Sequence, residues 1–336
     1  MKKLLITGAS GFIGGFLVEE ALSLGYETWA GLRASSSRQR LQDARIRPID
    51  LTYDDREALT RQLADFAAEQ GPWDYVIHNA GLTKALSRKD FFRVNALYTH
   101  NLIEALAAAG CCPRKFLLMS SLSSYGKGNE HTFAPLRTTD PQLPDSDYGK
   151  SKLEAECLLR RQTHFPYVIL CPTGVYGPGE RDYFLEMKSI GSGFDFSAGL
   201  HPQRISFIYV KDLARATLSV VGHEGISNAQ YFVSDNAVYT DAEFARMVQD
   251  ILGKKRLLRI RIPMGLVYLA CLCSEWIGRM KGQSMTLNRD KYLILKGRNW
   301  TCDASPLWGK LCLAPSYDLR SGLEETLAWY RREGWL

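Results

Sequence analysis

Short apolar runs alternate with longer amphipathic segments through the first half of the chain. The runs are rich in β-branched residues, whereas the longer segments repeat their apolar positions with the period of a helix. The runs predict strands at Lys3–Thr7, Thr28–Leu32, Arg45–Ile49, Tyr75–His78, Lys115–Ser120 and Tyr167–Cys171. The amphipathic segments predict helices at Phe12–Leu24, Asp55–Glu69, Lys89–Ala109 and Tyr148–Gln162. Strands that alternate with helices form βαβ units, so we expect an α/β fold with a doubly wound parallel sheet covered on both faces.

The pattern changes beyond about residue 172. Gly and Pro become dense in TGVYGPGE (173–180), and separate strand and helix pieces follow, including predicted helices at Asp241–Leu252 and Leu319–Glu333. We therefore expect a first domain over residues 1–171, joined by returning segments from about 204–235. A smaller C-terminal α/β lobe takes up most of residues 172–336, and the two parts share one cleft.

Composition narrows the class of protein. With 336 residues, 46% hydrophobic and 23% charged, the chain has globular composition, which excludes long disorder and fibrous repeats. The 42 Lys and Arg against 36 Asp and Glu give a net charge of +6, which we interpret as mild and spread along the chain. Phosphate-backbone binding needs a concentrated basic stripe, so we expect no nucleic-acid partner.

Two apolar segments raise the question of a membrane. The start, MKKLLITGASGFIGGFLV, resembles a signal peptide but contains four glycines, so we interpret it as a first strand and helix. The stretch Met264–Cys273 is too short to span a bilayer, and no membrane span is expected. The 8 cysteines form no C-x-x-C pair, which indicates reduced thiols and a cytoplasmic protein.

A glycine-rich turn follows the first strand and opens the first helix. It reads Thr7-Gly8-Ala9-Ser10-Gly11-Phe12-Ile13-Gly14. Gly8 permits the tight turn, Gly11 leaves room for phosphates, and Gly14 lets helix and strand pack closely. Backbone N–H groups and a helix N-terminus then meet a pyrophosphate, so the turn predicts a dinucleotide site.

The end of the second strand bears on the choice of dinucleotide. An acidic residue there would hold a ribose 2'-hydroxyl, yet residues 28–42 contain no Asp or Glu. They contain Arg33, Arg38 and Arg40 beside three serines, a set suited to a 2'-phosphate. We therefore expect NADP(H) in preference to NAD(H), which stays possible. The alternative is a solvated basic loop.

Tyr148 and Lys152 lie four residues apart at the start of a predicted helix and so share one face. An ammonium beside a phenol favours the phenolate and brings Tyr148 toward useful acid/base strength. The alternative is an ordinary surface pair. The glycine-rich turn and an upstream serine cluster favour catalysis.

Taken together, these motifs resemble the extended short-chain dehydrogenase/reductase family, a part of the NAD-dependent epimerase/dehydratase superfamily. The resemblance covers most of the chain and implies a Rossmann-type fold. It rests on TGASGFIG (7–14), Asp50-Leu51, HNAG (78–81), Asn95, MSSLSSYG (119–126), YGKSK (148–152) and PTGVYGPG (172–179).

The resemblance implies a Ser-Tyr-Lys catalytic set. Ser121 would hold the reacting oxygen, Tyr148 would exchange the proton, and Lys152 would lower the pKa of Tyr148 and bind the nicotinamide ribose. Ser120 and Ser123 are less favoured substitutes for the serine. Asp50 and Leu51 would flank the adenine. The implied cofactor-binding residues are Gly8, Ser10, Gly11, Phe12, Ile13, Gly14, Arg33, Arg38, Asp50, Leu51, Ala80, Gly81, Asn95, Pro172 and Val175. No metal ligand set is expected.

One departure from the family concerns the substrate. The segment 204–212 is similar to the RDFxHVxD segment of nucleotide-sugar epimerases, whose Arg holds the nucleotide diphosphate. Ile205 and Ser206 stand where that pattern has Arg and Asp, so the diphosphate clamp is missing or displaced to Arg204. A nucleotide-sugar substrate loses support. The candidate substrate residues are Thr83, Ser123, Tyr125, Thr173 and Arg204.

The C-terminal part is similar to the dihydroflavonol-reductase-like and 3β-hydroxysteroid-dehydrogenase-like side of the family. Its apolar helix, Met264–Met280, could admit a lipid-like ketone, or could be plain core or an oligomer contact. The family also suggests a homodimer through the helices at Lys89–Ala109 and Tyr148–Gln162.

Three functions remain in competition. The first is an NADP(H)-dependent oxidoreductase that passes a hydride to or from a carbonyl or secondary alcohol of a small-molecule substrate, lipid-like or a sugar. The second is a nucleotide-sugar epimerase or dehydratase that keeps its cofactor. The third is a non-catalytic NADP-binding sensor, which an intact Ser-Tyr-Lys set disfavours.

Overall fold

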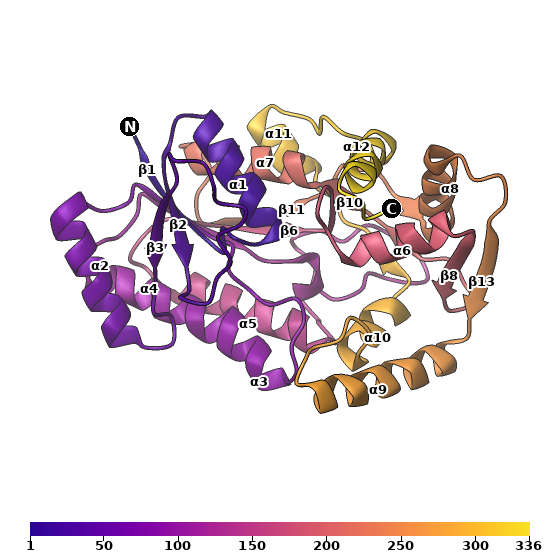
Figure 1. Ribbon diagram of the computed structural model, residues 1–336. Helices are drawn as coiled ribbons and strands as arrows, with labels where there is room; N and C mark the ends of the chain where they lie inside the picture. Colours follow the sequence, from indigo (N-terminus) through magenta and orange to yellow (C-terminus); the bar gives the residue numbers. More distant parts are fainter.

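A seven-stranded parallel sheet forms the centre of the molecule (Figure 1), whose computed structural model describes residues 1–336. Thr7 lies opposite His78 of one neighbour and Gly31 of the other, so the first strand is central. In spatial order the strands are β11 (Ala229–Val233), β6 (Tyr167–Pro172), β5 (Lys115–Met119), β4 (Tyr75–His78), β1 (Lys3–Thr7), β2 (Glu27–Leu32) and β3 (Arg47–Asp50).

Helices cover both faces of this sheet, as the alternating pattern predicts. On one face α1 packs against α7, and on the other α2, α4 and α5 lie in a row (Figure 1). The bounds are α1 (Phe12–Ser23), α2 (Arg56–Gln70), α3 (Arg88–Phe91), the π-helical turn η1 (Phe92–Leu97), α4 (Tyr98–Ala108), the 3₁₀ turn η2 (Leu122–Ser124), α5 (Asp147–Arg161), α7 (Val210–Gly222) and α11 (Ser305–Leu311).

A second, smaller lobe is built from short strands and the remaining helices. The strand pairs are β7 (Gly174–Tyr176) with β10 (Phe207–Tyr209), β8 (Phe194–Ala198) with β13 (Leu258–Ile262), and β9 (Arg204–Ile205) with β12 (Tyr239–Thr240) and β14 (Asn299–Trp300). The helices are α6 (Asp182–Gly191), α8 (Asp241–Leu252), α9 (Met264–Lys281), α10 (Arg289–Lys296) and α12 (Leu319–Arg332). A separate apolar cluster around Tyr176, Phe207 and Phe244 holds this lobe together.

The doubly wound fold expected from the sequence is confirmed, with small shifts at the ends of elements. The third strand begins at Arg47 instead of Arg45, because the backbone N–H of Arg45 donates to the Asp43 carboxylate in a turn. The glycine-interrupted N-terminus forms β1 and α1 as expected. None of the helices combines the length and apolarity that a membrane span requires.

A buried carboxylate fastens the C-terminal segment to the first domain. Asp212, in the first turn of α7, accepts hydrogen bonds from the backbone N–H groups of Ser316 at 2.9 Å and Tyr317 at 2.8 Å. Arg215 donates to the same carboxylate at 2.9 Å. Asp212 therefore holds the loop that leads into α12.

We expect Asp212→Ala to lower the free energy of unfolding by about 2–4 kcal/mol, since it leaves two backbone donors and Arg215 without their buried partner. The matched control is Asp250→Ala, whose exposed pair with Arg320 at 3.5 Å contributes about 0.5 kcal/mol or less. Urea denaturation of the two variants compares these effects. Equal losses would contradict the anchoring role of Asp212.

Candidate active site

A cavity of about 690 Å³ lies at the carboxyl ends of the central strands, between the two lobes. Ligands of open parallel sheets bind at this edge. Fifteen of the residues expected in a site line it: Gly8, Ser10, Gly11, Phe12, Ile13, Arg33, Ala80, Gly81, Thr83, Ser121, Ser123, Tyr148, Pro172, Thr173 and Val175. Gly14, Arg38, Asp50, Leu51, Asn95, Tyr125, Lys152 and Arg204 do not line it.

The glycine-rich turn forms one end of the cavity. Gly8 has φ +66°, and a Cβ there would lie 2.8 Å from the Ala80 backbone. A Cβ on Gly14 would lie 2.1 Å from the carbonyl oxygen of Gly8, so the start of α1 packs against the turn with no room for a side chain. No side chain caps the first N–H groups of α1 at Gly11. The turn therefore fits a pyrophosphate in shape and in donors.

The three arginines after β2 take different directions. Arg33 lines the cavity beside Ser36. Arg38 instead pairs with Asp50 at 3.3 Å on the exposed surface, and Arg40 reaches back to the carbonyl oxygen of Gly179. Leu51 is buried in the core. Arg38, Asp50 and Leu51 do not line the cavity in this structure, and their predicted roles in cofactor binding stay predictions.

Asn95 has a positioning role that the sequence did not reveal. Its Oδ1 accepts from the backbone N–H of Leu82 at 2.7 Å, and its Nδ2 donates to the carbonyl of Leu82 at 3.0 Å and to Ser151 Oγ at 2.9 Å. The amide thereby joins the loop after β4 to helix α5. Asn95 itself is buried and does not line the cavity, and its predicted part in cofactor binding stays a prediction.

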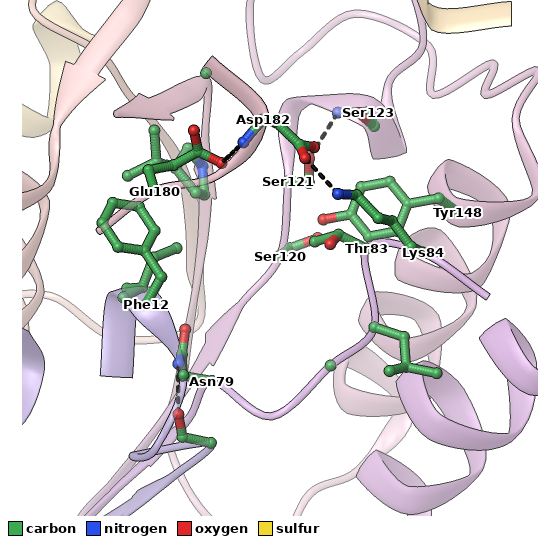
Figure 2. A pocket seen from close by; sticks show the side chains of 18 of the residues that line it. Phe12, Asn79, Thr83, Lys84, Ser120, Ser121, Ser123, Tyr148, Glu180 and Asp182 are labelled. Carbon is green, nitrogen blue, oxygen red and sulfur yellow. Dashed lines mark hydrogen bonds and ion pairs between the residues drawn. The ribbon is translucent and has the colours of Figure 1, made fainter. Parts of the chain in front are cut away.

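The residues of the predicted Ser-Tyr-Lys set come from the end of β5 and from α5. Ser146 caps α5 by accepting from the N–H of Gly149 at 3.0 Å, which places Tyr148 in the first turn. Tyr148 and Ser121 both line the cavity, where Figure 2 shows them with Ser120 and Thr83. Lys152 lies one turn further along α5, buried, and donates to the carbonyl of Met119 at 2.8 Å.

Burial dominates the electrostatics of this set. It raises the pKa of Tyr148 to about 12, although a hydrogen bond with Ser121 opposes the shift. Burial also lowers the pKa of Lys152 to about 8. The expected lowering of the Tyr148 pKa by Lys152 is therefore absent from this structure, because desolvation of the phenolate outweighs the charge of a lysine that points to Met119.

Helix α10 of the second lobe contacts the start of helix α5, which carries Tyr148. The carboxylate of Asp290 accepts from the backbone N–H groups of Asp147 and Tyr148 at the start of α5. Burial raises the pKa of Asp290 while these N–H groups oppose the shift. Asp290 of the second lobe thus caps the N-terminus of the helix that carries Tyr148.

The sequence patterns did not predict a group of charged side chains that line the cavity. Asp182 forms an ion pair with Lys84, seen in Figure 2, and lies 3.9 Å from Lys291. Glu180 accepts from the N–H groups of Asp182 and Tyr183, both at 2.7 Å. Burial raises the pKa of Glu186 to about 7, with Asp195 adding to the shift. The four-residue spacing of Asp182 and Glu186 could have shown that they share a face of α6.

Two expected substrate residues point away from the cavity. The Arg204 guanidinium lies 4.6 Å from the centre of the Phe133 ring, whereas its neighbours Ile205 and Ser206 line the cavity. Tyr125 is buried and donates to the carbonyl of Thr138 at 3.1 Å. Neither side chain lines the cavity in this structure, and the substrate roles predicted for Arg204 and Tyr125 stay predictions. For Arg204, the register of β9 between β12 and β14 fixes the direction of its side chain.

Comparison with known proteins identifies the family of the chain. The model of the NAD dependent epimerase/dehydratase family matches residues 4–233, more than half of the chain. The chain belongs to that family. Its relatives are NAD(P)-dependent enzymes, and the resemblance to extended short-chain dehydrogenases and reductases is confirmed.

Curated relatives of similar identity carry different activities. UDP-glucose 4-epimerase of Vibrio cholerae is 26% identical over 300 residues, covering 86% of this chain and 85% of that protein. Ceramide reductase of Caulobacter vibrioides is 26% identical over 333 residues, covering 98% and 95%. A 3 beta-hydroxysteroid dehydrogenase/Delta 5-->4-isomerase of Mycobacterium tuberculosis is 26% identical over 275 residues, covering 75% and 70%. Identity alone therefore does not choose among them.

Solved structures agree on the fold. UDP-glucose 4-epimerase of Thermotoga maritima, solved with UDP-glucose, superposes with a TM-score of 0.77 at 20% identity and covers 98% of this chain and 99% of that one. A dTDP-glucose 4,6-dehydratase of Bacillus anthracis, solved with NAD, gives 0.76 at 19% identity and covers 100% and 98%. These similarities show the Rossmann-type fold that this family member shares with them.

The buried Lys152 predicts how stability changes with pH. Below pH 8 the lysine is charged in both folded and unfolded chains, so wild type bears the full cost of burying an ammonium. From pH 8 toward the ordinary value of 10.5 the folded chain binds fewer protons than the unfolded chain, and this cost falls. We expect wild type to gain about 1 kcal/mol per pH unit relative to Lys152→Met over this range.

Unfolding free energies measured at about pH 7, 8 and 9 test this expectation. Tyr148→Phe is the control, since it keeps Lys152 and removes a group whose pKa, about 12 in the folded chain and ordinarily 10.0, lies above the range measured. It should follow wild type. A constant difference between wild type and Lys152→Met would contradict the lowered pKa.

Proposed function

We propose that this family member is an NADP(H)-dependent oxidoreductase that passes a hydride between the nicotinamide and a carbonyl or secondary alcohol. The proposed substrate carries no nucleotide diphosphate. The observation that supports this most is the charge of the cavity beyond the catalytic tyrosine, where carboxylates outnumber cations.

The acidic groups of that region are Glu180, Asp182, Glu186 and Asp290, and its cations are Lys84 and Lys291. Both lysines lie at Asp182: Lys84 pairs with this carboxylate, and Lys291 lies 3.9 Å from it. Bringing two phosphate charges among these carboxylates would cost free energy, and Ile205 offers neither charge nor donor in return. Arg204, the cation nearest in sequence, is held over Phe133 outside the cavity.

The cofactor half of the cavity supports NADP(H). Gly8, Gly11 and the start of α1 would hold the pyrophosphate, and Arg33 with Ser36 would bind a 2'-phosphate. No acidic residue lies among the ten residues 33–42 that directly follow β2, where one would favour a bare ribose. When bound, the cofactor supplies or accepts the hydride, and the protein supplies orientation and proton transfer.

Two residues would act on the substrate oxygen, and Lys152 would assist them. Ser121 would donate a hydrogen bond to it, and the phenol of Tyr148 would give it a proton during reduction or take one during oxidation. Lys152 would turn from Met119 toward the cofactor ribose and place positive charge behind the phenol, which lowers its pKa. With its pKa raised to about 12, Tyr148 is protonated at neutral pH in this structure.

Relatives support two reaction classes. The ceramide reductase and the hydroxysteroid dehydrogenase are named for redox chemistry, which agrees with the acidic cavity. The Vibrio cholerae epimerase supports the second candidate, a nucleotide-sugar epimerase or dehydratase that retains its cofactor. The two candidates differ in whether a nucleotide diphosphate binds.

Calorimetric titration of UDP, GDP and dTDP into the NADP-loaded protein tests the choice. We expect no binding at micromolar concentrations, because the carboxylates beyond the tyrosine outnumber the cations there. Micromolar binding that Arg204→Ala weakens would overturn the proposal and favour the epimerase. A screen of ketones that follows NADPH absorbance then measures net redox turnover.

Tyr148→Phe should keep the fold and cofactor affinity but lower kcat by about 10²–10⁴-fold, since only the proton-transferring hydroxyl is lost. The matched control is Tyr125→Phe, because that hydroxyl is bonded to Thr138 outside the cavity. Both variants are compared by single-turnover rates, measured with NADPH and a ketone that wild type reduces in the screen. Near-normal turnover of Tyr148→Phe would remove the tyrosine from the reaction.

Cofactor preference has a separate test. Wild type should bind NADPH about tenfold to hundredfold more tightly than NADH, and Arg33→Ala should abolish the difference by removing a charge-assisted phosphate contact. Arg38→Ala is the control, since Arg38 is paired with Asp50. Fluorescence titration of both cofactors gives the ratios. Equal affinities in wild type would refute the preference.

A further inference from the structure

Helix α9 presents an apolar stripe to solvent. Leu266, Leu269, Cys273, Trp276 and Met280 are spaced by three and four residues along it, and all five are exposed. Trp276 alone is 64% exposed. A surface helix of a globular protein has polar residues on its outer face, so this stripe departs from the ordinary pattern.

The opposite face of α9 already has its partners. Val267, Cys271 and Gly278 are buried, and Gly278 lies against Met285. Tyr268 packs edge-on against Tyr292 of α10 at 5.0 Å. The outer stripe is therefore a second apolar face, distinct from the one that packs the helix onto the lobe.

The ribbon that leads into α9 shows the same feature. In the β8–β13 pair, Phe194 lies opposite Leu258, and both are exposed together with Phe196. The alternate residue Asp195 points inward and pairs with Arg259 at 3.2 Å. Figure 1 shows this ribbon descending to the start of α9 along the outer edge of the second lobe, and no other element covers α9 from outside in that view.

Basic charge is concentrated around these apolar side chains. Residues 254–289, from the turn before β13 to the start of α10, contain eight Lys and Arg and a single acid, Glu275. The rest of the chain contains 34 Lys and Arg and 35 Asp and Glu, so the whole positive surplus resides here. The expectation of a net charge spread along the chain is thus corrected. Glu275 is itself bonded to Arg279 and Arg289.

We propose that the stripe of α9 and the β8–β13 ribbon dock the protein onto the surface of an anionic lipid membrane. A helix that lies in the interface buries leucine, tryptophan and similar side chains among the acyl chains while Lys and Arg meet the headgroups. Lys254 and Lys255 lie before the ribbon and Lys281 ends the helix, so free lysines flank the apolar side chains at both ends. Anionic headgroups match that charge at both ends of the surface.

A second copy of the chain fits this surface less well. Pairing by a two-fold axis would bring basic residues of the 254–289 segment against those of the other copy. Its one acid, Glu275, is already engaged by two arginines. Like charges in apposition oppose such an interface, whereas a lipid surface relieves them.

The stripe lies close to the cavity, which, if the proposed function holds, gives an apolar substrate a route from the membrane. The turn after α9 and helix α10 form one wall of the cavity through Thr286, Asn288 and Ile294. The same helical hairpin thus has the cavity on its inner side and the apolar stripe on its outer side. An apolar substrate could pass from the bilayer to Tyr148 along this wall.

Sedimentation of the full-length protein with vesicles tests the docking without any assay of activity. Vesicles of phosphatidylcholine with about one third phosphatidylglycerol should bind wild type, and pure phosphatidylcholine should bind it at least about tenfold more weakly. Leu269→Ser/Trp276→Ser/Met280→Ser should lower the affinity at least about tenfold. The matched control replaces three exposed leucines elsewhere, Leu24→Ser/Leu97→Ser/Leu143→Ser, and should bind as wild type.

The charge requirement is tested separately. Lys254→Gln/Lys255→Gln/Lys281→Gln should lower the affinity for anionic vesicles at least about tenfold, and Lys89→Gln/Lys188→Gln/Lys310→Gln should leave it unchanged. Circular dichroism verifies that each variant is folded. Absence of vesicle binding by wild type would overturn the proposal. So would a dimer in light scattering that the apolar α9 variant converts to monomer, since the stripe would then bind a second copy.

Discussion

The arrangement of the active site depends on the buried amide of Asn95. The loop after β4 carries Ala80 and Gly81, which line the cavity, while α5 carries Tyr148, which also lines it, and the buried Lys152. These segments are far apart in sequence, and Asn95 joins them by hydrogen bonds to Leu82 and Ser151. Gly81 has no side chain because the Lys152 ammonium and the Asn95 amide occupy the space that its Cβ would need. The hydrogen bonds of Asn95 thus fix the position of the loop after β4 relative to the helix that carries Tyr148.

Charge divides the cavity into two functional halves. Arg33 and the uncapped start of α1 make the dinucleotide end attractive to phosphates, whereas Glu180, Asp182 and Glu186 make the other end unfavourable for them. Overall identity does not separate the two reaction classes, because an epimerase and a reductase are equally similar to the chain. The charge of the cavity is therefore the observation on which the proposed redox function rests.

Sequence patterns predicted the parallel sheet, the glycine-rich turn and the cavity position of Ser121 and Tyr148, because local period and fixed motifs determine these features. They did not predict where long side chains turn. Arg38 and Arg204 were expected at ligands, yet an ion pair with Asp50 and a stack on Phe133 hold them on other surfaces. Such partners come from distant segments and leave no local pattern. The pKa of Tyr148 was also misjudged in direction, since desolvation depends on packing that only the folded chain defines.

The carboxylate of Asp290 joins two parts of the molecule that otherwise have separate roles. It lies on the hairpin of α9 and α10, and it caps the backbone of the helix that holds the catalytic phenol. Capping a helix in this way is worth about 0.5–2 kcal/mol, which corresponds to about a twofold to thirtyfold change in an equilibrium constant. Linkage is reciprocal, so whatever seats the hairpin also orders the first turn of α5, and a ligand that orders this turn seats the hairpin by the same factor. Slow hydrogen exchange at the amide of Tyr148 therefore reports on the position of a helix in the other lobe.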